Sequence, residues 1–232
     1  MNDQSLGIVL GTQTYKEHDA LVWVLLKEYG VRRFLYRGFN RNNSKMKNKG
    51  QLYHCYEFLF NYKEDGLLLP QSVALKESFI HLSTHVEKQM LASLLYELRS
   101  FISDQYELVY QYLSTLNQEK NPLLAYVLFL VQILHQQGLQ PLVDYDVFQG
   151  STKIRSFSIR EGGFVSSSPT TPYNKEQLQH IRWLFKGDFS VMEVLNELNI
   201  SPQIFELIVD YFEFHLNLRL KSWEIYQQIV YN

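Results

Sequence analysis

The sequence predicts an α+β protein in which a small β-barrel comes first and an all-helical domain follows. Short apolar runs separated by turn residues fill the N-terminal third, whereas apolar residues further on recur with the 3.6-residue period of helices. The 232 residues are 46% hydrophobic, which allows one or two domains with sizeable cores. We place the barrel domain at 1–78 and the helical domain at 79–232.

Five strands are expected in the barrel domain. Turn sequences such as Tyr29-Gly30 and Lys63-Glu64-Asp65-Gly66 separate the apolar runs. Five short strands in so few residues favour a closed sheet, and the five-stranded OB-fold barrel is the obvious candidate. The expected strands are Ser5–Thr12, Leu21–Glu28, Val31–Arg37, Tyr53–Asn61 and Leu67–Leu75.

Capping and helix-stopping residues mark the expected helices. Thr84 and Glu87 have the spacing of a capping box, ahead of apolar residues with helical period up to Ile102. A central helix is expected over Leu123–Gln137, and Gly138 is expected to end it. Between helices, residues 141–173 form an irregular insertion rich in Gly and Pro. Further helix starts are expected at Asn174 (capping Lys175–Phe185), at Ser190 with Glu193 as a second capping box, and at Ser201-Pro202.

Positive charge is concentrated in one short stretch. Between Tyr29 and Tyr56 there are seven cationic side chains and no carboxylate, whereas the remainder holds 15 basic and 24 acidic side chains. Such a stretch attracts polyanions, because each neutralised phosphate releases condensed counterions. A solvated basic loop is the alternative that composition leaves open. The seven are Arg32, Arg33, Arg37, Arg41, Lys45, Lys47 and Lys49.

The basic stretch covers the third expected strand and the loop 39–50, which we expect to be mobile. One strand face carries Arg33, Leu35 and Arg37, and the other carries Arg32, Phe34 and Tyr36. Neither face is purely apolar, so the inward face stays open. Tyr36 and Phe34 are therefore candidates either for stacking on bases or for the core. Cations beside aromatic strands suit single-stranded nucleic acid.

Two further cations, Arg219 and Lys221, are expected on the C-terminal helix. They are secondary candidates for extending a nucleic-acid path or for meeting a partner protein. A solvated helix end explains them equally well.

The sequence assembles no active site. It has no P-loop, no G-x-S-x-G and no G-x-G-x-x-G motif, so we expect a binding protein that is not an enzyme and has no cofactor. Cys55, the single cysteine, is expected to be a buried structural thiol and points to a reducing compartment. His81 and His85 could share a helix face, but no further ligand lies nearby in sequence. Without a signal peptide or a membrane-length apolar run, a soluble cytoplasmic protein is expected.

Several segments together resemble the RecO family of bacterial recombination mediators. The opening contains a Y-x-E-x-D turn and then R-G followed by basic residues and Ser, and the order and spacing of the later segments also agree with the family. The segments are Tyr15, Glu17 and Asp19; Arg37, Gly38, Arg41 and Ser44; Tyr96, Glu97 and Leu98; the loop Phe157–Val165; and the ending Leu218–Ile225.

The chain departs from the family where many members carry two cysteine pairs that form a zinc site. The first pair falls on Asp146 and Gln149, and the second falls on Ser166 and Pro169. Gln, Ser and Pro cannot build a closed tetrahedral zinc site, so we predict a zinc-finger-like insertion without zinc. Packing must then hold the segment together.

The resemblance implies a mediator that binds single- and double-stranded DNA and anneals complementary strands. It also implies partners: the C-terminal tail of single-strand DNA-binding protein (SSB), RecR and, indirectly, RecA, with a cytoplasmic, nucleoid-associated location. The alternative is a scaffold that docks acidic peptide tails on its basic loop without binding DNA directly.

Overall fold

A computed structural model describes residues 2–44, 46–118, 120–166 and 173–230. The chain forms two compact units, of which the first is Met1–Gln118 with Lys221–Asn232 and the second is Glu119–Leu220. A five-stranded sheet precedes the helices, so the predicted α+β class is confirmed. None of the helices in the described part of the chain is long and apolar enough to cross a membrane.

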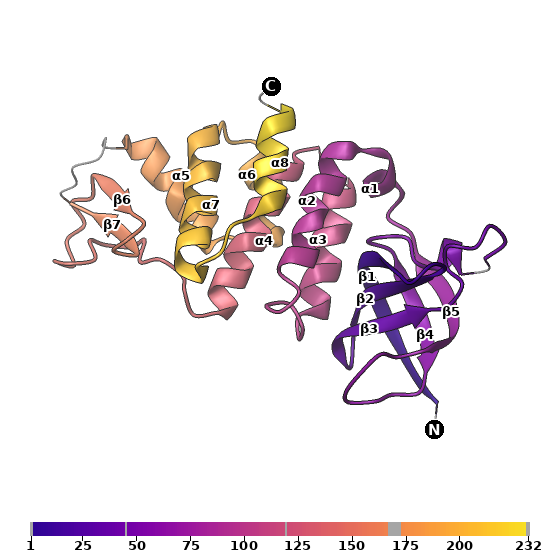
Figure 1. The fold of residues 1–232 in the computed structure, drawn as a ribbon. Coiled ribbons are helices and arrows are strands. Elements are labelled where there is room, and N and C mark those ends of the chain that lie inside the picture. Colours follow the sequence, from indigo (N-terminus) through magenta and orange to yellow (C-terminus); the bar gives the residue numbers. More distant parts are fainter. Residues whose placement is uncertain (1, 45, 119, 167–172, 231–232) are drawn as a thin grey trace. The chain divides into compact units, whose positions relative to one another are not determined.

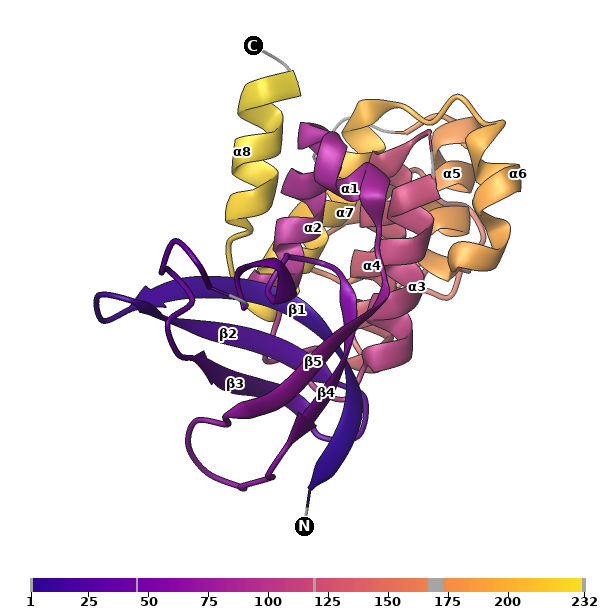
Figure 2. The same cartoon turned by 90° about the vertical axis from the view of Figure 1, so that its right-hand side faces the viewer.

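The first unit begins with an antiparallel sheet that curls into a barrel (Figures 1 and 2). The strand order is β3-β2-β1-β4-β5, and each expected strand is present with its ends shifted by a few residues. The strands are β1 (Asp3–Tyr15), β2 (Asp19–Leu26), β3 (Gly30–Tyr36), β4 (Cys55–Phe60) and β5 (Pro70–Glu77).

Backbone hydrogen bonds close the barrel between β3 and the residues that precede β5. The amide of Leu35 donates to the carbonyl of Leu68 at 2.8 Å, and the amide of Leu68 donates to the carbonyl of Arg33 at 2.9 Å. This short parallel bridge joins the two edges of the sheet. Closure satisfies backbone groups that an open edge would expose to other strands.

An aromatic core fills the barrel and decides which face of β3 points inward. Phe34 and Tyr36 are fully buried, whereas Arg33 on the opposite face is exposed. Gly7 packs directly against this core, because a Cβ there would lie 2.6 Å from Val24 Cγ1. Burying each large apolar side chain contributes roughly 1.5–3 kcal/mol. The core cluster includes Val9, Val22, Val24, Leu26, Phe34, Tyr36, Tyr56, Phe58, Phe60, Leu68 and Val73.

The α-helices among the described residues of the first unit are α1 (Ile80–Thr84), α2 (Val86–Glu97), α3 (Tyr106–Gln118) and α8 (Lys221–Val230). The capping box expected at Thr84 is wrong. Thr84 belongs to the last turn of α1, where its hydroxyl bonds back to the carbonyls of Ile80 and His81, and so it does not cap α2. At the start of α8, the carboxylate of Glu97 accepts hydrogen bonds from the amides of Lys221 and Ser222 at 2.7 and 2.9 Å.

In the second unit, a hairpin and further helices accompany the central helix α4. Asn121 caps α4 by accepting from the amide of Leu124, and Gly138 follows the helix with a φ of +69°, as predicted. The elements are α4 (Pro122–Gln136), β6 (Ser156–Ser158), β7 (Gly163–Val165), α5 (Lys175–Lys186), the 3-10 helix η2 (Phe189–Val191), α6 (Met192–Asn196) and α7 (Pro202–Leu216).

The other predicted helix starts of this unit had mixed outcomes. Asn174 and Gln177 form a reciprocal capping box on α5, which confirms the start expected there. The capping box expected at Ser190 is wrong, because Asp188 accepts from the Ser190 amide and Ser190 itself lies inside η2. The helix that starts after Ser201 ends at Asn217, which has a φ of +50°.

A buried carboxylate organises the insertion at the positions of the two cysteine pairs. Asp146 is 1% exposed, and its Oδ1 accepts from the amides of Phe148 and Gln149 at 2.9 and 2.8 Å. Its Oδ2 accepts from the amide of Ser166, so one side chain joins both segments. Burial raises the pKa of Asp146, but these N–H donors outweigh burial and leave the pKa below its usual value. Pro169 lies outside the described residues.

Candidate nucleic-acid interface

The predicted cationic residues lie at different places on the barrel. Arg37 follows the C-terminal end of β3, and Arg41 and Lys49 belong to the loop that comes next. Arg33 points outward from the strand itself. Of Lys47 only the backbone is described, in the 3-10 helix η1 (Lys47–Lys49), and Lys45 lies outside the described residues.

The loop start is fixed against the turn that joins β1 to β2. The amide of Asn40 donates to the carbonyl of His18 at 2.9 Å, and the amide of Gly38 donates to Asp19 Oδ1 at 2.8 Å. Gly38 has a φ of +65°, a conformation that favours glycine, and this turn reverses the chain directly after Arg37. Arg37 and Arg41 therefore extend from a hydrogen-bonded turn at one end of the barrel.

The stacking role considered for Tyr36 and Phe34 is wrong, because both rings are fully buried in the barrel core. Tyr36 has another relation to the basic loop. Its hydroxyl donates to the carbonyl of Lys49 at 3.2 Å, and the hydroxyl of Tyr56 donates more weakly to the carbonyl of Asn48 at 3.5 Å. Burial raises the pKa of Tyr36, so its hydroxyl keeps its proton and remains a donor.

Arg32 is separated from the loop cations. Its side chain points inward near the opposite end of β3, where the guanidinium lies 5.8 Å from the centre of the Tyr62 ring. One of its terminal nitrogens donates to the Tyr62 hydroxyl at 3.2 Å, and the other donates to the carbonyl of Val31 at 3.0 Å. Arg32 is thus a structural residue of the barrel end, and the phosphate contact expected of it has no geometric support.

The remaining described cations have no acidic partner among the described residues. In the described residues, no carboxylate lies within ion-pair distance of Arg33, Arg37, Arg41 or Lys49. Lys27, by contrast, pairs with Glu107 at 2.6 Å. Arg37 and Arg41 are exposed at the end of β3, and without an acidic partner among the described residues they keep their attraction for an external polyanion.

Trp23 is a residue that the sequence reasoning missed. It is the register partner of Arg33 on the outward face of β2 and is only half-buried. The edge of its ring meets Tyr96 of α2 at 5.3 Å between centroids and an angle of 89°. Arg99 lies 4.5 Å from the centre of the Tyr96 ring. The alternation of Leu21, Trp23 and Leu25 with their neighbours in the sequence could have indicated that Trp23 lies on the outward face of β2.

The two secondary candidates have acidic neighbours. Arg219 follows α7 instead of lying on a helix, and it lines a hollow together with Asp210 and Glu213. Lys221 is the first residue of α8, and its backbone amide is bound by Glu97. These neighbours reduce the attraction of either position for phosphate.

The cysteine and the paired histidines singled out in the sequence lie in separate surroundings. Cys55 is buried as predicted, with its Sγ 3.1 Å from the Tyr106 hydroxyl, and burial raises its pKa. His85 Nδ1 lies 2.9 Å from the carbonyl of His81. Across the described ranges, no three His, Cys, Asp or Glu side chains are close enough to hold a metal ion.

Fold and charge together give the class of the chain: an α+β protein with a small N-terminal barrel that carries unpaired cations among its described residues, and helices after it. Family models agree with this class: the one described as "Recombination protein O N terminal" matches residues 1–79, and the one described as "Recombination protein O C terminal" matches residues 83–224. The chain belongs to the RecO family.

Among the relatives that carry the name DNA repair protein RecO are proteins of three bacteria. The Halalkalibacterium halodurans protein is 25% identical to this chain, over 96% of the length of this chain and 93% of the length of the relative. The Bacillus pumilus protein is 25% identical, over 97% of this chain and 94% of its own. The Leuconostoc mesenteroides protein is 29% identical, over 69% of this chain and 66% of its own.

Proposed function

We propose that this protein is a recombination mediator in DNA repair that binds DNA without making or breaking bonds. It binds single- and double-stranded DNA and anneals complementary strands in the cytoplasm, at the nucleoid. With RecR, it assists the loading of RecA on DNA coated with SSB, whose C-terminal tail it also contacts. Family membership and the shared name of the relatives support this role.

The observation that carries the proposal is the group of unpaired cations at the end of β3. Arg37 and Arg41 are exposed, and no described carboxylate competes for them. Two DNA strands repel each other through their phosphates, and a protein that neutralises phosphates on both lowers that repulsion. Release of condensed counterions supplies the free energy of binding. Annealing therefore requires charge and position, and it needs no catalytic group.

The residues have separate roles in this proposal. Arg37, Arg41 and Lys49 contact phosphates, and Lys45 and Lys47 are proposed to extend the same contact along the loop. Arg33 and Trp23 form the outward face on which bases rest, because a cation beside a half-exposed ring suits single strands. Tyr36 and Tyr56 position the loop backbone.

Annealing of two complementary oligonucleotides, one carrying a fluorophore and the other a quencher, tests the proposal. The double variant R37A/R41A should weaken annealing and DNA binding together. The control is K27A/K63A, which removes the same formal charge from the first unit away from the basic loop, although Lys27 is paired with Glu107. Equal annealing by the two variants would show that the site is assigned wrongly. Retained binding of acidic peptides with no binding of DNA at low salt would contradict the function itself.

A further inference from the structure

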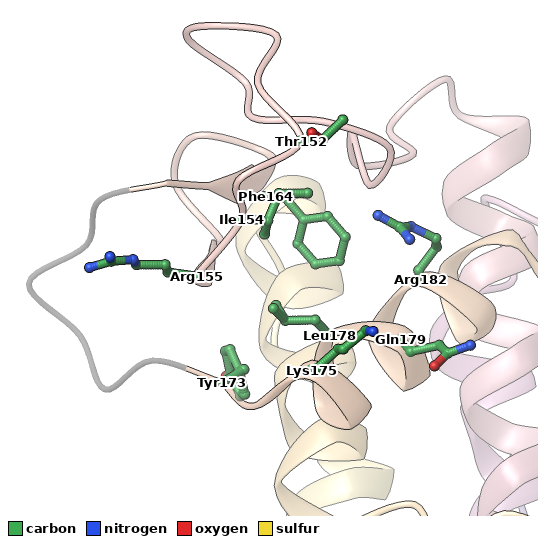
Figure 3. A pocket seen from close by; sticks show the side chains of 9 residues that line it. All are labelled: Thr152, Ile154, Arg155, Phe164, Tyr173, Lys175, Leu178, Gln179 and Arg182. Atoms are coloured by element: carbon green, nitrogen blue, oxygen red, sulfur yellow. The ribbon is translucent and has the colours of Figure 1, made fainter.

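The second unit contains a pocket that the barrel interface does not use. Its volume is about 640 Å³, which is within the usual range of small-molecule sites. Residues before β6, strand β7 and helix α5 line it, around the ring of Phe164 (Figure 3). Phe164 is fully buried and forms an apolar floor.

The pocket lining is cationic. Arg155, Lys175 and Arg182 all line it, and none of the described residues in the lining carries a carboxylate. Figure 3 shows Arg182 and Lys175 extending from α5 on one side of the Phe164 ring, with Arg155 on the other side. Lys175 is the first residue of α5, where the helix dipole adds positive potential. The pocket therefore favours an anion.

Arg182 is held in place before any ligand arrives. Its Nε donates to the carbonyl of Val143 at 2.7 Å, and its guanidinium lies 5.5 Å from the centre of the Phe164 ring. With Nε used for that bond, the two terminal nitrogens are left to donate. A planar guanidinium fixed in this way presents paired donors that match the oxygens of a phosphate.

From this geometry we infer that the pocket binds a nucleotide unit of single-stranded DNA, with its phosphate on Lys175 and Arg182. The inference rests on the proposed DNA-binding function and adds a second contact site to it. Arg155 meets a neighbouring phosphate. Gln179 supplies an amide, and the half-buried ring of Tyr173 supplies a surface for a base or sugar.

An acidic peptide is the competing occupant, and the lining favours the nucleotide. Carboxylates would satisfy the cations, but they would leave the amide of Gln179, the hydroxyl of Thr152 and the ring of Tyr173 without a role. Neutral hydrogen-bonding groups beside an aromatic ring and several cations are the combination that single-stranded nucleic-acid sites use.

Binding of a fluorescent oligo-dT to the full chain across a salt series tests the inference. The variant R155A/K175A removes two exposed pocket cations, and K153A/R160A removes two exposed cations of the same unit that do not line the pocket. Each single-strand phosphate contact contributes about 0.7 to the slope of log K against log salt. Arg155 holds its phosphate alone and Lys175 shares the other with Arg182, so R155A/K175A should lower the slope by about 0.7 to 1.4. K153A/R160A should leave it unchanged. R182K keeps the charge but loses the paired donors, so it should weaken binding at an unchanged slope.

The outcomes separate the pocket from the barrel site. Equal slopes for R155A/K175A and K153A/R160A, with the slope still lowered in R37A/R41A, would overturn the pocket inference and leave the proposed function standing. An unchanged DNA slope together with lost binding of an oligo-aspartate peptide would assign the pocket to a peptide, and would also overturn the inference. Thermal melts of all four variants, compared with the wild type, show whether a variant is folded.

Discussion

Replacing Tyr36 by Phe removes one hydroxyl and leaves every cation in place. The buried Tyr36 hydroxyl donates to the carbonyl of Lys49 at 3.2 Å and is the stronger of the two tyrosine contacts to the loop backbone. A neutral hydrogen bond contributes about 1 kcal/mol net to stability. The expected loss in Y36F is therefore about 1 kcal/mol, or about 2–4 °C in melting temperature for a chain of this size.

The same bond holds part of the proposed DNA contact, so its loss should also weaken DNA binding. If the full 1 kcal/mol orders the loop for binding, the affinity falls by up to about fivefold. The slope of log K against log salt should stay the same, because no charge is lost. Fluorescence anisotropy with single-stranded DNA at several salt concentrations measures both quantities.

Tyr29→Phe is the matched control. It also removes one tyrosine hydroxyl from the barrel, at the opposite end, where that hydroxyl donates to Asp3 Oδ1 at 3.1 Å. Y29F should lose at least as much stability as Y36F, because the acceptor of Tyr29 is a carboxylate, but only Y36F should lose DNA affinity. Equal affinity in both variants would refute the positioning role of Tyr36.

Three further outcomes are expected. Asp146→Asn should destabilise the second unit and make its stability depend less on pH in the acid range. Because the folded-state pKa of Asp146 is lowered, the wild type has this stability above the unfolded-state pKa and loses it as the pH falls through the folded-state pKa. Thermal melts from pH 7 to pH 3 measure this difference. Purified protein should contain far less than one zinc per chain by elemental analysis, because Asp146 and Ser166 stand at cysteine positions, and one bound zinc would contradict this. Gly11→Ala should lower the free energy of unfolding, measured by urea titration, by about 1–3 kcal/mol, because the added Cβ would lie 2.4 Å from the Tyr96 ring. Gly66→Ala is the control: its Cβ would meet no atom within 4 Å, so this variant tests backbone strain alone.

Patterns along the chain were sufficient to predict the strands of the barrel. The five strands appear where alternating apolar residues and turn residues predicted them, because both signals are local. The inward face of β3 was not predictable, since each face carries arginine. The structure resolves this because Arg32 lies near a barrel end, where its guanidinium reaches Tyr62 while its stem is half-buried.

Contacts between residues far apart in the chain could not be predicted from the sequence. Tyr96 packs on Trp23, Cys55 meets Tyr106, and Tyr110 donates to Glu77 at 2.6 Å, so α2 and α3 form one compact unit with the barrel. No periodicity encodes which side chains meet across such separations. Helix α3 itself had a usable signal that was missed, because its buried residues recur at helical spacing.

The role of Asp146 could not be predicted for a different reason. Its partners are backbone amides, and a single aspartate in an irregular segment carries no pattern that announces them. The sequence indicated only that thiolates were missing. The structure adds that the Asp146 carboxylate joins the two segments at which many members of the family carry the cysteine pairs.

The central claim is that cations at one end of the barrel grip the DNA backbone. The most direct measurement is the salt dependence of single-stranded DNA binding by R37A/R41A beside K27A/K63A. The account predicts a slope lower by about 1.4 in R37A/R41A alone, which corresponds to two lost phosphate contacts. Identical slopes and affinities for R37A/R41A and the unaltered protein would contradict it.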